Sequence, residues 1–159
     1  MADYQPAVDR TLRFEDSTLS GKLTDDTGGL TRFGISERAH PEVYPEMAEC
    51  SVPDALAIAR QVLARYWCFN EVESQDVANK LFDMAVNLGL GTTIIMAQRC
   101  TGTLADGIWG PKTVYAINAS PGLLQCLRKA QAQHYRDLAE FDPAKYGDYL
   151  KGWLVRADY

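Results

Sequence analysis

The chain is organised around residues 25–35, DDTGGLTRFGI, and around the Phe14-Glu15 pair that precedes them. Residues 6–14 predict a first helix, because apolar side chains recur at helical spacing and Pro6 suits a first helical turn. Glu15 then falls at the C-terminal end of that helix, where the helix dipole disfavours ionisation of a carboxyl group. The pattern therefore sets a carboxylic acid beside a loop rich in Asp, Thr and Gly.

The residues that join these two segments carry no helical period. Ser, Thr, Gly and Asp dominate residues 16–33, which predicts a loop or a small irregular hairpin. Residues 36–40 predict a short helix or turn that Pro41 ends. The chain thus contains one small irregular region outside its helices.

The rest of the chain predicts helices. Ser51 is a capping residue with Asp54 three positions later, and Gly89 ends a second helix. Pro111 and Ser120-Pro121 mark two further helix starts. The predicted helices cover residues 52–67, 75–88, 92–100, a segment that begins at 111, 121–140 and 146–156. We expect one mostly helical α+β domain over residues 1–159.

Composition and charge argue against several classes of partner. The chain has 159 residues, 47% of them apolar and 23% charged, which suits one soluble domain with a core. A net charge of −5 without a run of Lys or Arg argues against nucleic acid and anionic membranes. No stretch approaches the roughly 20 apolar residues that span a bilayer, and residues 1–6 do not resemble a signal peptide. We expect synthesis in the cytoplasm.

The cysteines and histidines do not form a metal-binding pattern. Cys50, Cys68, Cys100 and Cys126 lack C-x-x-C spacing, and His40 and His134 are far apart in the sequence. We therefore expect neither a metal site nor a cofactor. Free buried thiols are favoured over disulfides. His134 is interpreted as a core histidine on an apolar helix face.

The carboxyl groups near the opening motif could serve glycoside hydrolysis. This reaction requires an acid to protonate the leaving oxygen and a second group that acts as base, nucleophile or stabiliser. Glu15 is the candidate acid, and Asp25, Asp26 and Thr31 are candidates for the second group. By spacing alone, however, a glutamate near an Asp/Thr loop is more often a solvated surface.

The amino acids found in four segments are more specific evidence than the spacing of the carboxyl groups. Glu15 followed by residues 26–35, DTGGLTRFGI, resembles glycoside hydrolase family 108, the peptidoglycan N-acetylmuramidases of phages and bacteria. That family typically has Glu-Gly-Gly-Tyr and then Asp-Pro-Gly-Gly-x-Thr-x-Tyr-Gly-Ile. Similar family segments exist for residues 81–89, LFDMAVNLG, for residues 106–113, DGIWGPKT, and for residues 151–156, KGWLVR. The four segments occur in the family's order and cover nearly the whole chain.

The resemblance implies a lysozyme-like fold in which a small irregular or β lobe faces a multi-helix lobe. Residues 1–75 would form the catalytic half. Residues 76–159 would form a helical half similar to a peptidoglycan-binding region, packed with the first as one unit. Glu15 is implied as the essential acid, and Asp26 and Thr31 match the Asp and Thr of the family's loop motif.

Four further residues are candidates for substrate binding. Asn87 is a candidate ligand of substrate or water, and Asp83 would support it from one helical turn earlier. Trp109 would either stack on a sugar or peptide or serve as a buried anchor. Asp25 is a further candidate beside Asp26. Tyr146, Tyr149 and Trp153, at helical spacing, are interpreted as core and not as a sugar platform.

The sequence departs from the family directly after the acid. Asp16-Ser17 replaces the family's Gly-Gly, and the segment from Glu15 to Asp26 is longer than usual. Two alternatives therefore stay open beside a muramidase. One is a non-catalytic or weakly active peptidoglycan-binding homologue, and the other is a glycosidase that acts on chitin-like polymers.

The leading hypothesis is hydrolysis of the β-1,4 bond between N-acetylmuramic acid and N-acetylglucosamine in peptidoglycan, leading to cell-wall lysis. The expected partners are glycan strands of peptidoglycan, and the expected state is a monomer. A muramidase without a signal peptide suits a phage endolysin released by a holin-type membrane lesion. It also suits a bacterial lysin passed through a dedicated secretion system. In either case it acts on the cell wall.

Overall fold

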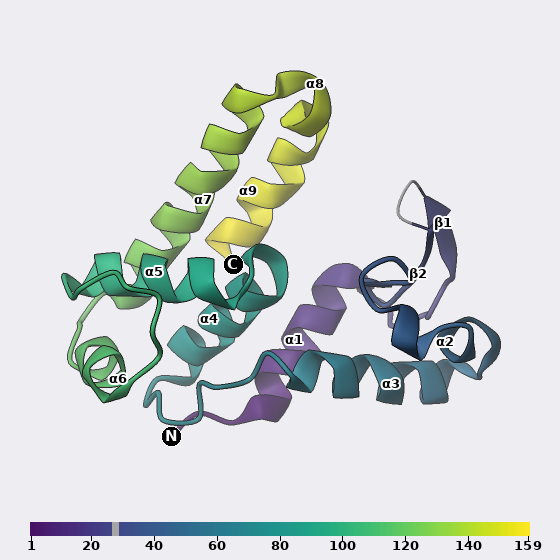
Figure 1. Cartoon of the computed structure of the whole chain (residues 1–159), viewed down its shortest axis with the longest axis horizontal. Helices are drawn as coiled ribbons and strands as arrows, with labels where there is room; N and C mark the ends of the chain where they lie inside the picture. The colour runs from purple at the N-terminus through teal and green to yellow at the C-terminus, as the bar shows by residue number, and fades with distance from the viewer. Residues whose placement is uncertain (27–28) are drawn as a thin grey trace. The chain divides into compact units, whose positions relative to one another are not determined.

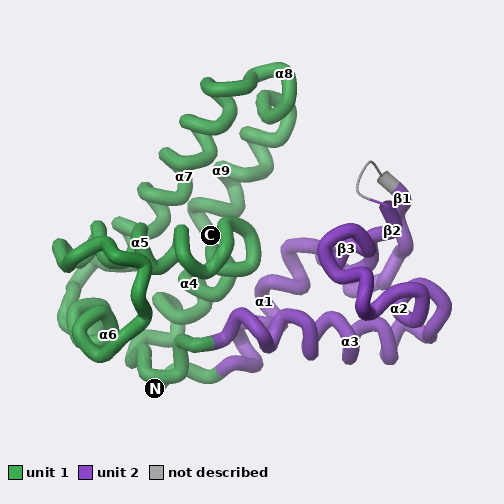
Figure 2. Tube along the Cα trace, in the orientation of Figure 1, with its two compact units in different colours: residues 1–3, 68–159 green, residues 4–67 purple. Residues whose placement is uncertain are grey.

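The computed structural model describes residues 1–26 and 29–159, and it describes Asp26 by its backbone alone. The chain divides into two compact units, which Figure 2 colours separately. Residues 4–67 form one of them, called here the sheet unit. Residues 1–3 and 68–159 form the other, called the helical unit.

The sheet unit combines two packed helices with a small antiparallel sheet (Figure 1). Helix α1 packs against α3 and buries Val8, Leu12, Ala59 and Val62. In the sheet, Thr24 lies opposite Thr31 and Arg32 lies opposite Ile35. The elements are α1 (Tyr4–Glu15), β1 (Thr24–Asp26), β2 (Gly29–Arg32), β3 (Ile35–Ser36), η1 (Pro41–Val43), α2 (Glu46–Glu49) and α3 (Val52–Ala64).

The sheet refines the prediction for the irregular region. Residues 16–33, expected as a loop or irregular hairpin, contain the β1–β2 hairpin. The predicted helix or turn over residues 36–40 is a turn, and Ser36 at its start belongs to β3. Strands of two to four residues are too short to display the alternation of polar and apolar side chains that marks a strand in a sequence.

A buried arginine joins three segments of the sheet unit. Arg32, in β2, is only 6% exposed. Its Nε donates to the Gly21 carbonyl at 2.8 Å, and its Nη1 donates to the carbonyls of Met47 at 2.8 Å and Cys50 at 2.9 Å. Because a buried guanidinium is costly unless its N–H groups are satisfied, these bonds hold the loop before β1 and the end of α2 against the sheet.

The helical unit contains α4 (Gln75–Leu88), α5 (Leu90–Thr101), α6 (Pro111–Asn118), α7 (Leu123–Phe141), α8 (Pro143–Tyr146), η2 (Gly147–Tyr149) and α9 (Leu150–Asp158). Figure 1 shows α7 and α9 side by side as a long helical hairpin, and α4 and α5 both pack against α7. Side chains such as Leu81, Phe82, Met84 and Leu127 are fully buried in its core.

Several helix ends match their sequence signals. Ser51 Oγ accepts from the Asp54 amide at 3.3 Å, and Ser74 Oγ accepts from the Val77 amide at 3.4 Å. Gly89 ends α4 with a φ of +83°. The mostly helical α+β class expected for a lysozyme-like protein is therefore confirmed. Helix α3 is shorter than predicted, since it ends at Ala64.

One buried and one partly buried cation of the helical unit tie α4 to α9. Lys80 is 2% exposed, and its Nζ donates to the carbonyls of Arg156 at 3.1 Å and Ala157 at 2.7 Å. Arg156 in turn pairs with Asp83 through Nη2 and Oδ1 at 2.8 Å. A cation near a helix C-terminus is favourable because it faces the negative end of the helix dipole. The closing helix is thus held by ionic contacts as well as by its apolar face.

The cysteines correct one prediction. Cys100 and Cys126 form a disulfide with a Cα–Cα distance of 5.8 Å, so the expectation of free thiols is wrong for this pair. Cys50 and Cys68 are free, and burial raises the pKa of the Cys68 thiol to about 11. The disulfide joins α5 to α7 across 26 residues of sequence, a closeness that spacing alone does not reveal.

The aromatic residues near the C-terminus correct a second prediction in part, namely that Tyr146, Tyr149 and Trp153 belong to the core. The Trp153 ring stacks on Tyr135 at a centroid distance of 4.9 Å and on Tyr149 at 5.8 Å. Tyr149, however, is 59% exposed and does not belong to the core.

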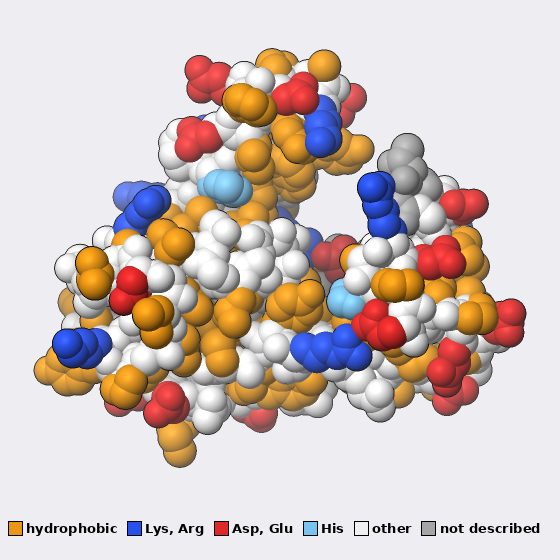
Figure 3. Space-filling model, viewed as in Figure 1, with side chains coloured by type: hydrophobic (Ala, Val, Ile, Leu, Met, Phe, Trp, Pro, Cys, Tyr) orange, Lys and Arg blue, Asp and Glu red, His pale blue; other side chains and the backbone are white. Residues whose placement is uncertain are grey.

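Acidic and basic side chains are interspersed over the face of the molecule that Figure 3 displays. Within residues 1–26 and 29–159, no helix is both long enough and apolar enough to cross a bilayer. The same residues contain no group of three or more His, Cys, Asp or Glu side chains placed to hold a metal ion.

Candidate active site

A pocket of about 380 Å³ opens beside Glu15 in the sheet unit. Glu15 is the last residue of α1, and its side chain is exposed to this pocket. The other walls come from the loop after α1, from the paired strands β1 and β2, and from the β2–β3 turn. The lining residues are Glu15, Asp16, Ser17, Ser20, Lys22, Thr24, Thr31, Phe33 and Gly34.

The β2–β3 turn packs closely against the Glu15 side chain. Gly34 has a φ of +77°, which favours glycine. A Cβ atom at this position would lie 2.5 Å from Glu15 Cγ and 2.8 Å from Glu15 Oε2. Phe33 also has a positive φ, +53°, and buries its ring in the core. The buried Phe33 ring therefore fixes the turn, and the carboxyl group of Glu15 packs against the backbone of Gly34.

The sequence contained a signal for this contact. The Phe-Gly pair lies inside the opening motif, and a glycine directly after a strand predicts a positive φ or a close approach. Nothing in the sequence says which side chain makes that approach, because Glu15 is 19 positions away. Lys22 and Thr24, which also line the pocket, were not predicted as site residues.

Asp16 organises the loop that follows the candidate acid. Its Oδ1 accepts from the Thr18 amide at 3.2 Å and from Thr18 Oγ1 at 3.0 Å. Its Oδ2 accepts from Ser20 Oγ at 2.9 Å and from the Gly21 amide at 2.8 Å. Desolvation acts to raise the pKa of Asp16, but the hydrogen bonds from Gly21, Ser20 and Thr18 outweigh it and lower the pKa to about 2.

This network fixes the loop in which Asp16-Ser17 stands in place of Gly-Gly. The Asp16 carboxylate bonds to the loop, and Gly21 continues the chain of contacts by accepting from Arg32. Gly21 has a φ of +64°, and a Cβ atom there would lie 2.9 Å from Phe33 Cζ. The longer loop is therefore a structured wall of the pocket, fixed from Asp16 through Gly21 to β2.

Thr31 lies in the pocket wall, whereas Asp25 of β1 does not. Thr31 is half-buried in β2, and its carbonyl accepts from Thr24 Oγ1 at 3.3 Å. Asp25 is exposed and does not line the pocket, because successive strand residues point to opposite faces and Thr24 is the one that faces it. Asp26 pairs with Gly29 through β1, and its side chain lies outside the described residues.

The other predicted site residues belong to the helical unit. Asp83 is 4% exposed, and its carboxylate is held by Arg156. Asn87 is exposed one turn later, and its Nδ2 donates to the Asp83 carbonyl at 2.7 Å. Their expected roles with substrate stay predictions, and the structure gives the Asp83 carboxylate an internal partner.

Trp109 and its turn are part of the same unit. The turn is held by Gln98, whose Nε2 donates to Asp106 Oδ1 at 2.7 Å and whose Oε1 accepts from the Gly107 amide at 2.9 Å. The Trp109 ring meets Phe69 edge-on at a centroid distance of 5.0 Å. Its Nε1 is buried and finds no hydrogen-bond partner among the described residues. These contacts favour the buried-anchor interpretation over stacking on a ligand.

Comparisons with known proteins divide the chain between α4 and α5, and not at the boundary of the two compact units. The sequence matches the family described as glycosyl hydrolase 108 over residues 10–89. It also matches a predicted peptidoglycan domain over residues 92–158. A search of curated protein sequences found no significant match. The first match contains Glu15 with its whole pocket and extends through α4, and the second begins in α5. The chain belongs to the glycosyl hydrolase 108 family and carries a predicted peptidoglycan domain in its C-terminal part.

Proposed function

We propose that this protein hydrolyses the β-1,4 bond between N-acetylmuramic acid and N-acetylglucosamine in peptidoglycan. The observation that carries the proposal is the position of Glu15, a carboxyl group at a helix end, exposed in a pocket and lying directly over Gly34. Membership of a glycosyl hydrolase family and the predicted peptidoglycan domain support the choice of reaction and of polymer.

Glu15 is proposed as the general acid that protonates the glycosidic oxygen. Such an acid requires a fixed direction, because proton transfer depends on hydrogen-bond reach to the leaving oxygen. Gly34 below the carboxyl group and the Asp16 loop beside it supply that fixed position. The Asp16 carboxylate is bonded within its own loop, which leaves the acid role to its neighbour.

Asp26 and Thr31 are proposed to supply the second function, which is to position water or to stabilise the oxocarbenium-like transition state. Thr31 offers a hydroxyl group in the pocket wall across from the end of α1. Thr24 and Lys22, which line the same pocket, are proposed to contact the hydroxyl and acetamido groups of the sugars. Ligand pockets of this size typically contain a few polar groups of this kind, which orient the ligand.

The test is hydrolysis of purified peptidoglycan by the intact chain. Glu15→Gln keeps the size of the side chain and removes the acid, so the rate of new reducing ends should fall by about 100- to 10,000-fold. Glu49→Gln is the matched control, since Glu49 is exposed at the end of α2 and does not line the pocket. It should retain the wild-type rate. Full activity of Glu15→Gln would refute the assignment of the acid.

The identity of the new reducing end defines the bond. Borohydride reduction of the products converts a new N-acetylmuramic acid end into its alditol, and mass spectrometry identifies it. Reduced N-acetylglucosamine ends would contradict the proposed bond. Binding to peptidoglycan without any new reducing ends would instead favour the non-catalytic homologue, and hydrolysis of chitin oligomers in preference to peptidoglycan would favour the chitin-directed alternative.

A further inference from the structure

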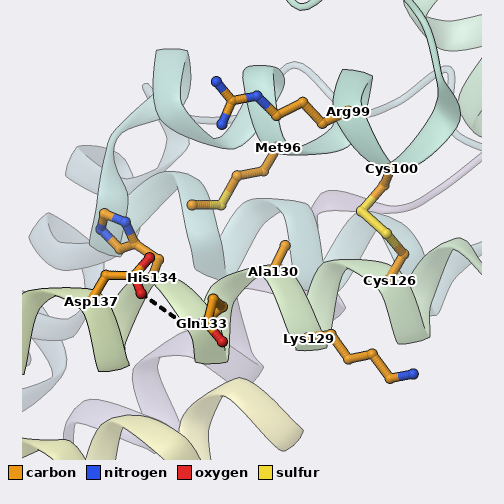
Figure 4. Close-up of a pocket in the computed structure, with 9 residues that line it drawn as sticks. All are labelled: Met96, Arg99, Cys100, Cys126, Lys129, Ala130, Gln133, His134 and Asp137. Carbon is orange, nitrogen blue, oxygen red and sulfur yellow. Dashed lines mark hydrogen bonds between the residues drawn. A yellow bond between two sulfur atoms is a disulfide. The ribbon is translucent and has the colours of Figure 1, made fainter.

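A second pocket lies wholly in the helical unit, between α5 and α7. It has a volume of about 540 Å³, and we call it the α5–α7 groove. Figure 4 shows that its residues come from the facing sides of these two helices. All of them fall within residues 92–158, the segment that matches a predicted peptidoglycan domain. The groove is therefore separate from the Glu15 pocket, and the proposed hydrolysis assigns it no role.

The inner surface of the groove is apolar and covalently fixed. Met96 extends from α5, and Ala130 faces it from α7 (Figure 4). The Cys100–Cys126 disulfide closes one end and joins the two helices. A groove whose walls are cross-linked is pre-formed, and a pre-formed site loses less entropy when a ligand binds.

The rim of the groove carries an excess of positive charge. In Figure 4 the Arg99 side chain extends along α5, and the Lys129 side chain projects from α7 on the side away from α5. The acidic residue of the rim is Asp137, whose Oδ1 accepts from Gln133 Nε2 at 2.7 Å. His134, expected in the core, is instead half-buried in this groove. The lining of the groove thus includes two permanent cations and one carboxylate, in a chain whose net charge is −5.

We propose that the α5–α7 groove binds the peptide stem of peptidoglycan through its carboxylate groups. The inference rests on the proposed function, because it takes peptidoglycan as the polymer. A stem peptide combines free carboxylates with short methyl side chains. Arg99 and Lys129 match the first, and the surface of Met96, Ala130 and the disulfide matches the second. Arg in particular binds carboxylates through two parallel N–H groups.

The groove fits a peptide better than a sugar. Sugar rings are recognised largely by aromatic faces, and none of the described residues that line the groove is Phe, Tyr or Trp. A neutral glycan also makes no use of the cationic rim. The sheet unit would then act on the glycan, while the helical unit would hold the peptide attached to it.

The experiment uses the full chain and a peptide that carries no glycan, so that binding is measured apart from hydrolysis. The probe is the N-acetylated tetrapeptide L-Ala-γ-D-Glu-L-Lys-D-Ala, titrated by calorimetry at low ionic strength. Two comparison ligands are the same peptide with amidated carboxyl groups and a tetramer of N-acetylglucosamine. We expect the free-acid peptide to bind, with an affinity that falls as salt is added. The two comparison ligands should bind at least about fivefold more weakly.

Three variants locate the binding. Arg99→Glu reverses one charge of the rim and should weaken the affinity for the free-acid peptide by about tenfold. Asp137→Asn removes the opposing carboxylate and should strengthen binding by about threefold. Lys112→Glu makes the same charge change on α6, at an exposed position that does not line the groove, and should leave the affinity unchanged. Opposite effects of the first two variants cannot arise from loss of folding.

Equal affinity of wild type and Arg99→Glu would overturn the proposal, as would equal affinity for the amidated peptide or no binding up to the solubility limit. Release of reducing ends from peptidoglycan is measured on the same preparations. If that activity persists and depends on Glu15 while the peptide fails to bind, the groove proposal fails alone. If no reducing ends appear either, the proposed function fails with it.

Discussion

The two units of this chain use polar side chains in opposite ways. In the sheet unit, Glu15, Thr24 and Thr31 face an open pocket, and the buried polar group behind them, Arg32, bonds to backbone carbonyls. In the helical unit, two charged residues of α4 are buried: Asp83 pairs with Arg156, and Lys80 bonds to the end of α9. A carboxyl group therefore lines a candidate site in one unit, at Glu15, and stabilises the packing of helices in the other, at Asp83.

The difference follows from the secondary structure available to each unit. Short strands and turns with positive φ place side chains and bare backbone side by side, as at Gly34 beneath Glu15. Long helices that pack on each other instead bury any polar side chain on their inner faces, which must then find a partner. A polar residue in a motif is thus a poor guide to catalysis until its unit is known. Four predictions test this contrast.

The largest effect is expected from the buried ion pair of the helical unit. Asp83→Asn removes the charge of the Asp83 carboxylate from its pair with the Arg156 guanidinium, which is 13% exposed, and should lower the free energy of unfolding by about 3–5 kcal/mol. Urea denaturation measures this loss. Asp9→Asn is the matched control in the sheet unit, because the Asp9–Arg60 pair is about 40% exposed and should contribute at most about 1 kcal/mol.

Because Asp83 is assigned to the framework and not to the site, Asp83→Asn should leave the catalytic rate intact. Below its unfolding transition the variant should hydrolyse peptidoglycan with an unchanged kcat. A variant that keeps wild-type stability and loses kcat would show instead that Asp83 acts on substrate, and would remove the distinction between the two units.

The next effect concerns the disulfide that joins α5 to α7. The double substitution Cys100→Ser/Cys126→Ser should lower the free energy of unfolding by about 3 kcal/mol, because a loop of 26 residues is no longer closed in the unfolded chain. Wild-type protein treated with a reductant should show the same loss. The double variant Cys50→Ser/Cys68→Ser, which keeps the disulfide, should remain sensitive to reductant. Insensitivity of the wild type to reductant would count against the bond.

The third effect concerns the site itself. Gly34→Ala introduces a Cβ atom 2.5 Å from Glu15 Cγ and should displace the carboxyl group. We expect activity on peptidoglycan to fall by about 100-fold, equivalent to about 2.7 kcal/mol of activation free energy. Stability should fall by a smaller amount, about 1–2 kcal/mol, because alanine is disfavoured at positive φ.

Gly147→Ala is the control for this change. Gly147 has a φ of −57°, and no atom lies within 4 Å of an added Cβ. This variant should keep both its activity and its stability. If Gly34→Ala were as active as Gly147→Ala, the contact between the β2–β3 turn and the Glu15 side chain would have no part in hydrolysis.

The smallest effect is a pH dependence that arises from Asp16. Its pKa in the folded chain, about 2, is below its ordinary value of 3.8. The stabilisation by its ionised form is therefore fully present above about pH 4 and is lost as the pH falls through about 2. Asp16→Asn should consequently melt below wild type near neutral pH, and the difference in Tm should shrink in acid. Ser17→Ala, in the same loop, should show no such convergence; parallel Tm curves for Asp16→Asn would contradict the role of its charge.

The helices of this chain could be predicted closely from the sequence, because their signals are local. Ser51 precedes the first residue of α3 and Gly89 follows the last residue of α4, and the structure begins and ends these helices there. The family motifs likewise led to Glu15 as the candidate acid. What these cases share is that the interacting residues are near each other in sequence or belong to one motif.

The remaining features depend on contacts between distant residues. The approach of Gly34 to Glu15, the Asp83–Arg156 pair and the Cys100–Cys126 bond each join segments that only the fold brings together. Asp83 was a candidate for substrate binding because it lies one helical turn before Asn87. The cysteines were expected to be free because buried free thiols are common. The network of Asp16 is local, but its sequence signal, an Asp in place of Gly, indicated a departure without indicating what replaces the lost turn.

Arg32 has a consequence for the motions of the sheet unit. One side chain bonds to the carbonyls of Gly21, Met47 and Cys50, so the loop beside Glu15 and the end of α2 share a single anchor in β2. Hydrogen exchange of the amides in these segments should therefore proceed through one shared opening event rather than three independent ones. The wall of the Glu15 pocket would then open only as part of a cooperative unit that extends well beyond the residues lining it.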